Sequence, residues 1–219
     1  MTPKQLSVVG LAAALLAVTG CGPGGGALLY FAGVGQTQKV EARYTLGEGP
    51  ILVLVDDFNE RLTWPETQDL LAEQTADELL ARKATKKIIS CDALRRLRQA
   101  RPDFDRLCCN EIGRLIGADQ IVWLEVADFF ASQAVEDTGS AARMAVTVKV
   151  VNPRGTRKDG TVRLWPKEHD GQPVKAALSS NDVSRAGSRR AIAEALSSKL
   201  AVEVARLFYD HTAEDLVKP

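Results

Sequence analysis

The sequence predicts an α/β fold built on a mixed sheet, in a two-layer or three-layer sandwich. Three observations predict it: an unbroken apolar run at residues 51–55, helix-like segments between the strand-like segments that follow, and a long amphipathic helix near the C-terminus. The predicted order of elements is β-α-β-α-β-β-β-α. Strands separated by helices favour parallel pairs, and strands that follow one another directly favour antiparallel pairs, so we expect both kinds.

The first strand and the first helix have clear signals. Residues 51–55 read ILVLV, which is typical of a strand covered on both faces. A helix is expected to begin at residues 64–66, because a proline at position 65 suits the first helical turn. Its apolar positions between 71 and 80 fall on one face. Residues 86–90 are predicted to form a short second strand.

A second helical region is predicted from Asp92 to Ile116, with an interruption around Pro102. Gly117 follows it, and a glycine at this position suits the left-handed backbone that ends many helices. The apolar residues from Gln120 to Val126 then predict a third strand.

The last third of the chain is predicted to hold two strands and a closing helix. Residues 142–151 alternate as a strand does, and after the turn residues NPRG a strand at 161–166 is expected to pair with it as a hairpin. Residues 167–182 are expected to form a polar loop that offers a contact surface if it is exposed. One long amphipathic helix is predicted over 183–211.

The first residues have the pattern of an export signal. Lys4 precedes an apolar run at residues 6–18, which is too short to span a bilayer but suits the core of a signal peptide. Residues 18–21 read VTGC and resemble the lipobox of bacterial lipoproteins, in which the cysteine receives a lipid and a peptidase cleaves before it. The resemblance implies that residues 1–20 are a signal peptide and that Cys21 carries the lipid.

Residues 21–38 are expected to join this anchor to the domain. Residues 22–26 read GPGGG, which cannot continue a helix and predicts a tether. Residues 27–34 are apolar. Two interpretations stay open for them: contact with the membrane interface, or packing against protein. Gly22 stands where an aspartate would retain such lipoproteins in the inner membrane, which favours the outer membrane, facing the periplasm. Residues 39–219 are then expected to be a single α/β domain.

Three further segments carry a resemblance to a known group. They are IGAD at 116–119 before the apolar strand, AVTVKVVN at 145–152, and LAVEVARLF at 200–208. In this order, within residues 48–210, they resemble the TolB-N-terminal-like and CsgG-like group of envelope lipoproteins. The resemblance implies a non-catalytic module that binds or assembles in the periplasm. The long alternating segments of the pore-forming members are missing from this sequence, which leaves a binding role.

Composition excludes some classes of partner. Lysines and arginines number 28, and so do aspartates and glutamates, so the chain has no net charge that would attract nucleic acid over long distances. One helix nevertheless has a basic side, formed by Arg95, Arg96, Arg98, Arg101 and Arg106. We expect a solvated face balanced by Asp103, Asp105 and Glu111, with docking to an acidic partner or to lipid headgroups as the alternative.

The strongest candidate for catalytic chemistry is Asp56-Asp57, directly after the first strand. Ligands collect at the carboxyl ends of parallel strands, so a metal-dependent hydrolase that uses both carboxylates is the enzymatic alternative. Phe58 stands where a haloacid-dehalogenase-like motif requires a second aspartate. The favoured interpretation is therefore that the two aspartates end the strand and turn the chain.

The remaining reactive residues predict no further site. Besides Cys21 the chain has Cys91, Cys108 and Cys109; a Cys91–Cys108 disulfide stays open, and buried, unpaired thiols are favoured. The two histidines show no metal-ligand spacing, and the three tryptophans are expected in the core. No catalytic residue, metal or cofactor is predicted.

The sequence therefore predicts a membrane-tethered, non-enzymatic binding or assembly module of the cell envelope. Its expected contacts are the membrane, through the lipid on Cys21, and an unidentified envelope protein, with its own copies as another candidate and nucleic acid excluded. An oligomeric secretion component is the alternative function, and a hydrolase that uses Asp56 and Asp57 is less favoured.

Overall fold

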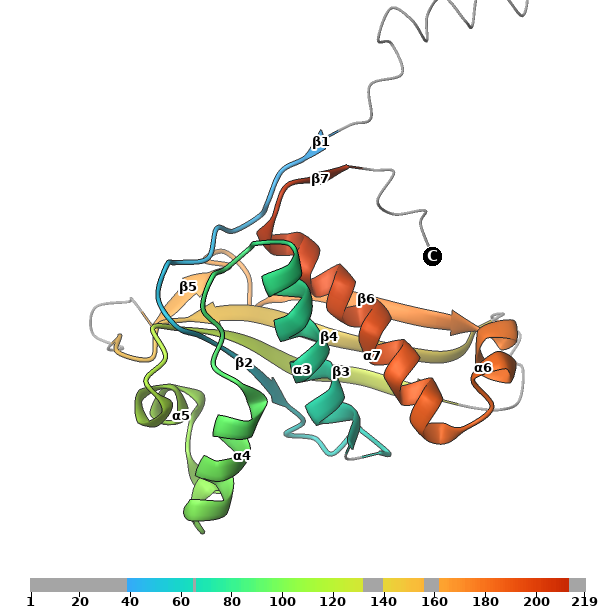
Figure 1. Cartoon of the computed structure of the whole chain (residues 1–219), viewed down its shortest axis with the longest axis horizontal. Coiled ribbons are helices and arrows are strands. Elements are labelled where there is room, and N and C mark those ends of the chain that lie inside the picture. The colour runs from blue at the N-terminus through green and yellow to red at the C-terminus, as the bar shows by residue number, and fades with distance from the viewer. Residues whose placement is uncertain (1–38, 65, 132–139, 156–161, 213–219) are drawn as a thin grey trace, which may run out of the picture. The chain divides into compact units, whose positions relative to one another are not determined.

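In the computed structural model the described residues are 39–64, 66–131, 140–155 and 162–212 (Figure 1). The predicted signal peptide, Cys21, the tether and the apolar segment 27–34 lie outside them. Contacts divide the chain into a unit of residues 41–211 and a second unit of residues 1–40 and 212–219. The short strands β1 (Lys39–Val40) and β7 (His211–Thr212) pair with each other as a separate two-stranded sheet.

The larger unit confirms the predicted mixed α/β fold. In chain order its strands and helices are β2 (Ile51–Asp56), α3 (Glu66–Ala81), α4 (Cys91–Ala100), the short 3₁₀ helix η1 (Phe104–Arg106), α5 (Cys109–Ile116), β3 (Gln120–Ala131), β4 (Ser140–Val151), β5 (Arg163–Trp165), β6 (Gln172–Ser179), α6 (Ser180–Ala186), α7 (Arg189–Ala205) and the 3₁₀ helix η3 (Arg206–Phe208). None of the described helices is long and apolar enough to cross a membrane.

The five-stranded sheet is centred on β3 and β4. The edge strand β2 runs parallel to β3, in a register that pairs Ile51 with Gln120 and Asp56 with Glu125. β4 runs antiparallel to β3 along one edge and pairs with β6 and then β5 along its other edge. The helical segment from α3 to α5, between β2 and β3, therefore acts as the crossover connection that parallel pairing requires.

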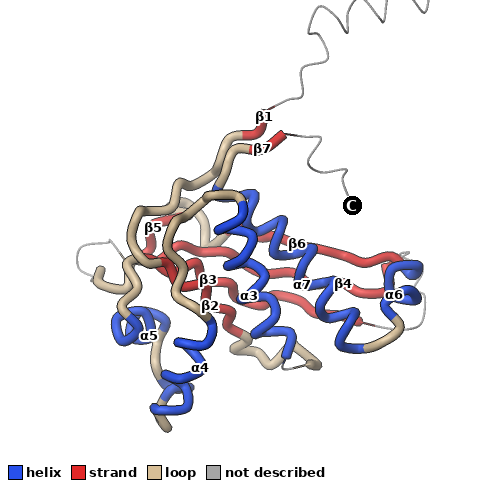
Figure 2. Tube along the Cα trace, in the orientation of Figure 1, coloured by secondary structure: helices blue, strands red, loops and turns tan. Residues whose placement is uncertain are grey.

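Helices α3 and α7 lie side by side over one face of the sheet (Figures 1 and 2). Leu71 and Leu79 of α3 and Leu196 and Leu200 of α7 are fully buried in the main core with the inward-facing side chains of the strands. Burial of each such side chain contributes about 1.5–3 kcal/mol. This layer provides the main apolar burial of the fold.

The opposite face has a smaller core. Because side chains alternate along a strand, Leu52 and Leu54 of β2 point away from α3 and α7 and pack in a second cluster. That cluster includes Leu94 of α4, Phe104 of η1 and Ile112 of α5. The sandwich thus has three layers where α4 to α5 cover β2, β3 and the end of β4.

Several predicted elements are confirmed. The strand at 51–55 and the helix that begins at Glu66 form as expected, and the second helical region is interrupted near Pro102. Gly117 ends α5 with φ of 80°, the left-handed conformation that a glycine adopts without a steric penalty.

Three sequence-based predictions were wrong. Residues 86–90 form only an isolated bridge between Ile88 and Ile51 instead of a strand. The predicted polar loop contains β6, whose Ala176 and Leu178 are buried because β4 pairs with it. The predicted last helix is two helices, because Gly187 adopts φ of 69° and Ser188 begins α7 by accepting the Ala191 N–H.

Candidate functional site

The candidate site is a groove of about 1520 Å³ on the face of the sheet that carries the smaller core. Its floor consists of side chains from β2, β3 and β4, including Leu54, Asp56, Trp123, Lys149 and Val151. Its walls come from the end of α4 through the start of α5, from the loop after β2, and from β5 and the loop that follows it. Segments far apart in the sequence therefore line one concave surface.

Strand alternation explains which side chains form the floor. Residues two apart share one face of a strand, so Leu54 and Asp56 both lie on the groove face of β2. In the same way Trp123 and Glu125 both lie on the groove face of β3. The register places Trp123 opposite Lys149 of β4 and Asp56 beside Glu125. The pairing of the strands thus brings acidic, basic and aromatic side chains together at the centre of the sheet.

Lys149 has the most unusual position in the groove. It is only 8% exposed, and its Nζ lies 2.6 Å from Oε2 of Glu125 and 5.0 Å from the centre of the Trp123 ring. A buried ammonium group needs a charged or polar partner to offset the loss of hydration. The carboxylate of Glu125 provides that partner, and the aromatic face provides a second favourable contact.

A second carboxylate reaches the same lysine from the groove mouth. Oδ1 of Asp170 lies 3.6 Å from Nζ of Lys149 and accepts a 3.0 Å hydrogen bond from Nη1 of Arg163. The side chain of Asp170 is 94% exposed, whereas that of Lys149 is 10% exposed. A solvated carboxylate therefore bridges two cations of the groove.

The predicted Asp56-Asp57 pair divides into two roles. Both oxygens of Asp57 accept backbone N–H groups at 2.8 Å, one from Arg61 and one from Leu62. This confirms that Asp57 turns the chain after the strand. Asp56 instead lines the groove, in register with Glu125.

No metal-ligand set is present among the described residues. There, no group of three or more histidine, cysteine or acidic side chains is arranged to hold a metal ion. Neighbouring strands bring Asp56 and Glu125 side by side, but Lys149 already pairs with Glu125. The chemistry of this cluster is that of ion pairing.

The described cysteines are unpaired, as predicted, but they are not all buried. Cys108 is exposed and caps α5, where its backbone N–H donates to Glu111 at 3.0 Å; Cys91 and Cys109 are partly buried. Burial raises the pKa of both Cys91 and Cys109 to about 11. These two thiols stay protonated at neutral pH and are poor nucleophiles.

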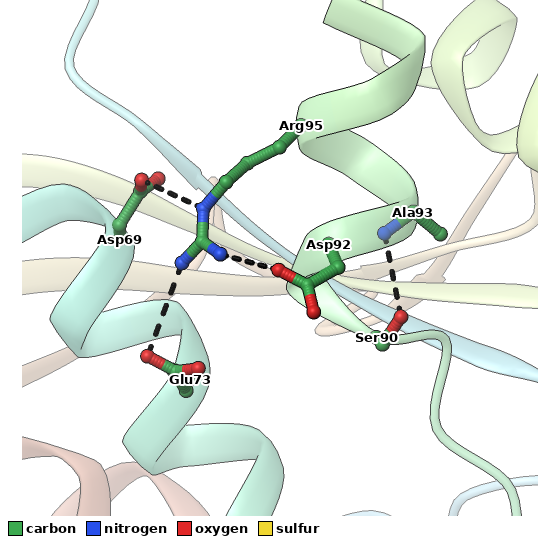
Figure 3. Close-up of polar contacts among 6 residues, drawn as sticks. All are labelled: Asp69, Glu73, Ser90, Asp92, Ala93 and Arg95. Carbon is green, nitrogen blue, oxygen red and sulfur yellow. Dashed lines mark hydrogen bonds and ion pairs between the residues drawn. The ribbon is translucent and has the colours of Figure 1, made fainter.

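The predicted basic side of the second helical region is partly neutralised. Arg95 joins α4 to α3, because its guanidinium pairs with Asp69 at 3.3 Å and reaches Glu73 at 4.0 Å, as well as Asp92 on its own helix (Figure 3). Arg101 forms two 2.9 Å hydrogen bonds with Asp103. Of the three carboxylates expected to balance this face, Asp103 pairs with Arg101 as predicted. The partners of Arg95 come instead from α3 and from Asp92.

Sequence reasoning missed the residues at the centre of the groove. The sequence predicts Trp123 in the core, and the side chain does pack, partly buried, against the smaller core, but its ring also lines the groove beside Lys149. For Lys149 and Glu125 the sequence predicts strand positions and no pairing. A signal was present: Lys149 is the single charged residue in the apolar stretch AVTVKVV. A lysine at such a position predicts either a solvated face or a buried partner.

No family model and no curated protein matches the chain. Among solved structures it is similar to lipoprotein GNA1162 from Neisseria meningitidis, with a TM-score of 0.42 and 13% identity over 60% of this chain and 82% of that one. It is also similar to the PelC dodecamer from Paraburkholderia phytofirmans, with a TM-score of 0.40 and 14% identity over 78% of this chain and 96% of that one. A third similar structure is the LpoB C-terminal domain from Salmonella enterica, with a TM-score of 0.36 and 16% identity over 63% of this chain and 87% of that one.

These TM-scores and identities mark a loose likeness of fold. One of these neighbours is a lipoprotein, and another is a dodecamer. The resemblance to the TolB-N-terminal-like and CsgG-like group is not confirmed by them.

Proposed function

We propose that this chain is a lipid-anchored lipoprotein of the cell envelope that binds a protein partner through the groove, without catalysis. The observation that carries the proposal is the groove itself, with Phe58 at its edge. Phe58 lines the groove and is 89% exposed. Aromatic side chains, phenylalanine among them, are enriched at protein interfaces relative to the rest of the protein surface.

The size of the groove supports a macromolecular partner. Small-molecule sites have volumes of roughly 300–1,000 Å³. At about 1520 Å³ the groove is larger, and apolar side chains such as Leu54 and Val151 lie beside its ion pairs. This combination suits a segment of a protein, which brings several side chains at once.

The anchor in this proposal is the lipid on Cys21. The lipobox-like residues VTGC and the GPGGG tether would hold the domain at the membrane, in the periplasm, with Gly22 favouring the outer membrane. We expect radiolabelled palmitate to be incorporated into the wild-type chain and not into Cys21→Ser. Equal labelling of the two chains would contradict the anchor.

Partner binding is tested by crosslinking and pull-down from native envelopes. The wild-type chain is expected to recover a protein, and Phe58→Ser is expected to recover much less of it. The matched control is Leu80→Ser, which removes an exposed apolar side chain from α3, outside the groove. Recovery of no partner by the wild type, or equal recovery by Phe58→Ser, would contradict the proposal.

Self-association is the alternative to a different partner. Among the described strands β6 pairs only with β4, so its outer edge is open to a second copy. However, β6 carries Pro173 and the exposed Lys175, residues that discourage strand pairing at sheet edges. Light scattering on Cys21→Ser is therefore expected to give the mass of a monomer, and a defined oligomer would favour the assembly function.

A further inference from the structure

We propose that Lys199 closes the outer edge of β6 against a second copy of the chain, and that the chain stays monomeric for this reason. The inference goes beyond the proposed binding function and does not depend on the groove. It follows from the main-chain groups on this edge, several of which already bond to side chains of the same chain. Figure 1 shows β6 at the edge of the sheet, with α7, the helix that carries Lys199, packed against the same sheet.

The alternation of the strand tells which groups of β6 face outward. In an antiparallel pair every second residue directs its N–H and C=O to the partner strand, and the residues between direct theirs away from it. Pro173 has no N–H and lies opposite Thr147 of β4, so it takes an outward-facing position. Lys175 and Ala177 follow at the same period and also face outward. Their N–H and C=O groups are the ones that an added strand would pair with.

The two ends of this edge are closed by neighbouring side chains. At one end the carbonyl of Pro173 accepts a 3.2 Å hydrogen bond from Nε2 of Gln172. At the other end the backbone N–H of Ser179 donates to Oδ2 of Asp182 at 3.0 Å, within the capping box of α6. The hydrogen bonds from Ser179 lower the pKa of Asp182, so this carboxylate is ionised and accepts them at neutral pH.

Lys199 closes the part of the edge between these ends. Its Nζ donates a 2.8 Å hydrogen bond to the carbonyl of Ala177 from an exposed position on α7. An added strand would lie about 4.8 Å from β6 and would place its own amide nitrogen about 2.9 Å from this oxygen. The strand would therefore have to displace the ammonium group or bury it, and burial of an unpaired charge is costly. A lysine at a sheet edge discourages strand pairing in this way.

The outer edge of β2 is closed by the backbone instead. The N–H of Ile51 donates to the carbonyl of Lys87 at 3.0 Å, and its carbonyl accepts the N–H of Ile89 at 2.8 Å. Further along, the carbonyl of Val55 accepts Nε2 of Gln68 at 2.7 Å. Main-chain hydrogen bonds survive most substitutions, whereas the closure of β6 depends on a lysine side chain. A single substitution can therefore open the edge of β6.

A second copy of β6 fits the edge that Lys199 covers. Two copies that run antiparallel about a two-fold axis at Ala176 bring Lys175 of each copy opposite Ala177 of the other. The outward N–H and C=O groups of both residues then pair across the axis. In the free chain Lys199 occupies the Ala177 carbonyl that this pairing needs.

The test is the mass of the Cys21→Ser chain, measured by light scattering over a range of concentrations. Lys199→Met is expected to give a dimer, with twice the mass, at concentrations where Cys21→Ser alone is a monomer. Arg190→Met is the matched control, because it removes an exposed cation from the first turn of α7, and it is expected to stay monomeric. A monomer for Lys199→Met at every concentration, dimers in both variants, or a dimer of Cys21→Ser itself would overturn the inference.

A second substitution assigns the dimer to β6. Ala177→Pro removes an outward N–H and leaves the pairing with β4 intact, because this N–H faces away from β4. Combined with Lys199→Met it is expected to restore the monomer. A dimer that persists in the double variant would show that the added methionine makes the contact, which would overturn the inference. Partner capture that depends on Phe58 is measured separately, so these failures would leave the proposed binding function standing.

Discussion

The carboxylate of Glu125 and the ammonium group of Lys149 lie 2.6 Å apart on neighbouring antiparallel strands, next to the ring of Trp123. Because Lys149 is nearly buried, loss of its partner leaves a charge with poor hydration. Glu125→Gln is therefore expected to destabilise the fold by about 1–3 kcal/mol, as measured by chemical denaturation.

A double variant provides the control for this pair. Glu125→Gln combined with Lys149→Met removes both charges and should recover part of the stability lost in Glu125→Gln alone. If the double variant instead loses as much stability as the sum of the Glu125→Gln and Lys149→Met losses, the two side chains do not interact in the folded protein.

The layer formed by α3 and α7 is tested by a cavity in its core. Leu200 is fully buried on α7, so Leu200→Ala is expected to lower the free energy of unfolding by about 2–5 kcal/mol. Glu194→Ala changes an exposed residue of the same helix and should shift stability by less than about 0.5 kcal/mol. A comparable loss in both variants would contradict the assigned face of α7.

The end of α5 depends on the backbone of Gly117. An added side chain would meet no atom within 4 Å, but φ of 80° is unfavourable for any residue with a Cβ. Gly117→Ala is therefore expected to cost about 1–2 kcal/mol in thermal or chemical unfolding. An unchanged free energy of unfolding would show that α5 ends differently.

The cysteines should differ in reactivity. In Cys21→Ser at pH 8, iodoacetamide is expected to modify the exposed Cys108 first, because burial raises the pKa of Cys91 and Cys109 to about 11. Peptide mapping by mass spectrometry reports the three rates. Faster modification of Cys109 than of Cys108 would contradict the placement of the two thiols.

The same pKa shifts set the sign of a pH effect on stability. Above an ordinary thiol pKa of 9.0 the unfolded chain releases these protons while the folded chain keeps them until about pH 11. The folded state then binds more protons, so the contribution of these thiols to stability falls between pH 9 and pH 11. A rise in stability across this window, after correction with Cys91→Ser and Cys109→Ser, would contradict the burial.

Local patterns were sufficient to predict much of the fold. The run at residues 51–55 has few alternatives to a covered strand, and Gly117 ends a helix through its own backbone freedom. β6 was missed because its inward positions, Val174, Ala176 and Leu178, are interrupted by Pro173 and Lys175. Only pairing with β4 makes this segment a strand, and that pairing is a long-range effect.

The candidate site was less predictable than the fold. Asp57 could be assigned to the chain turn from its position, and the hydrogen bonds confirm it. The role of Lys149 depends on which face of the sheet the helices leave open, and on the loop that brings in Asp170. Neither is encoded in the strand that carries the lysine.

Photo-crosslinking from Phe58 in living cells tests partner binding through the groove most directly. p-Benzoylphenylalanine replaces Phe58 at the groove edge in one strain and the exposed Ala195 of α7 in the other. We predict an envelope protein crosslinked from position 58 and not from position 195, with the crosslink lost when Cys21→Ser removes the anchor. Equal crosslinking from the two positions, or none from position 58, would contradict the proposal.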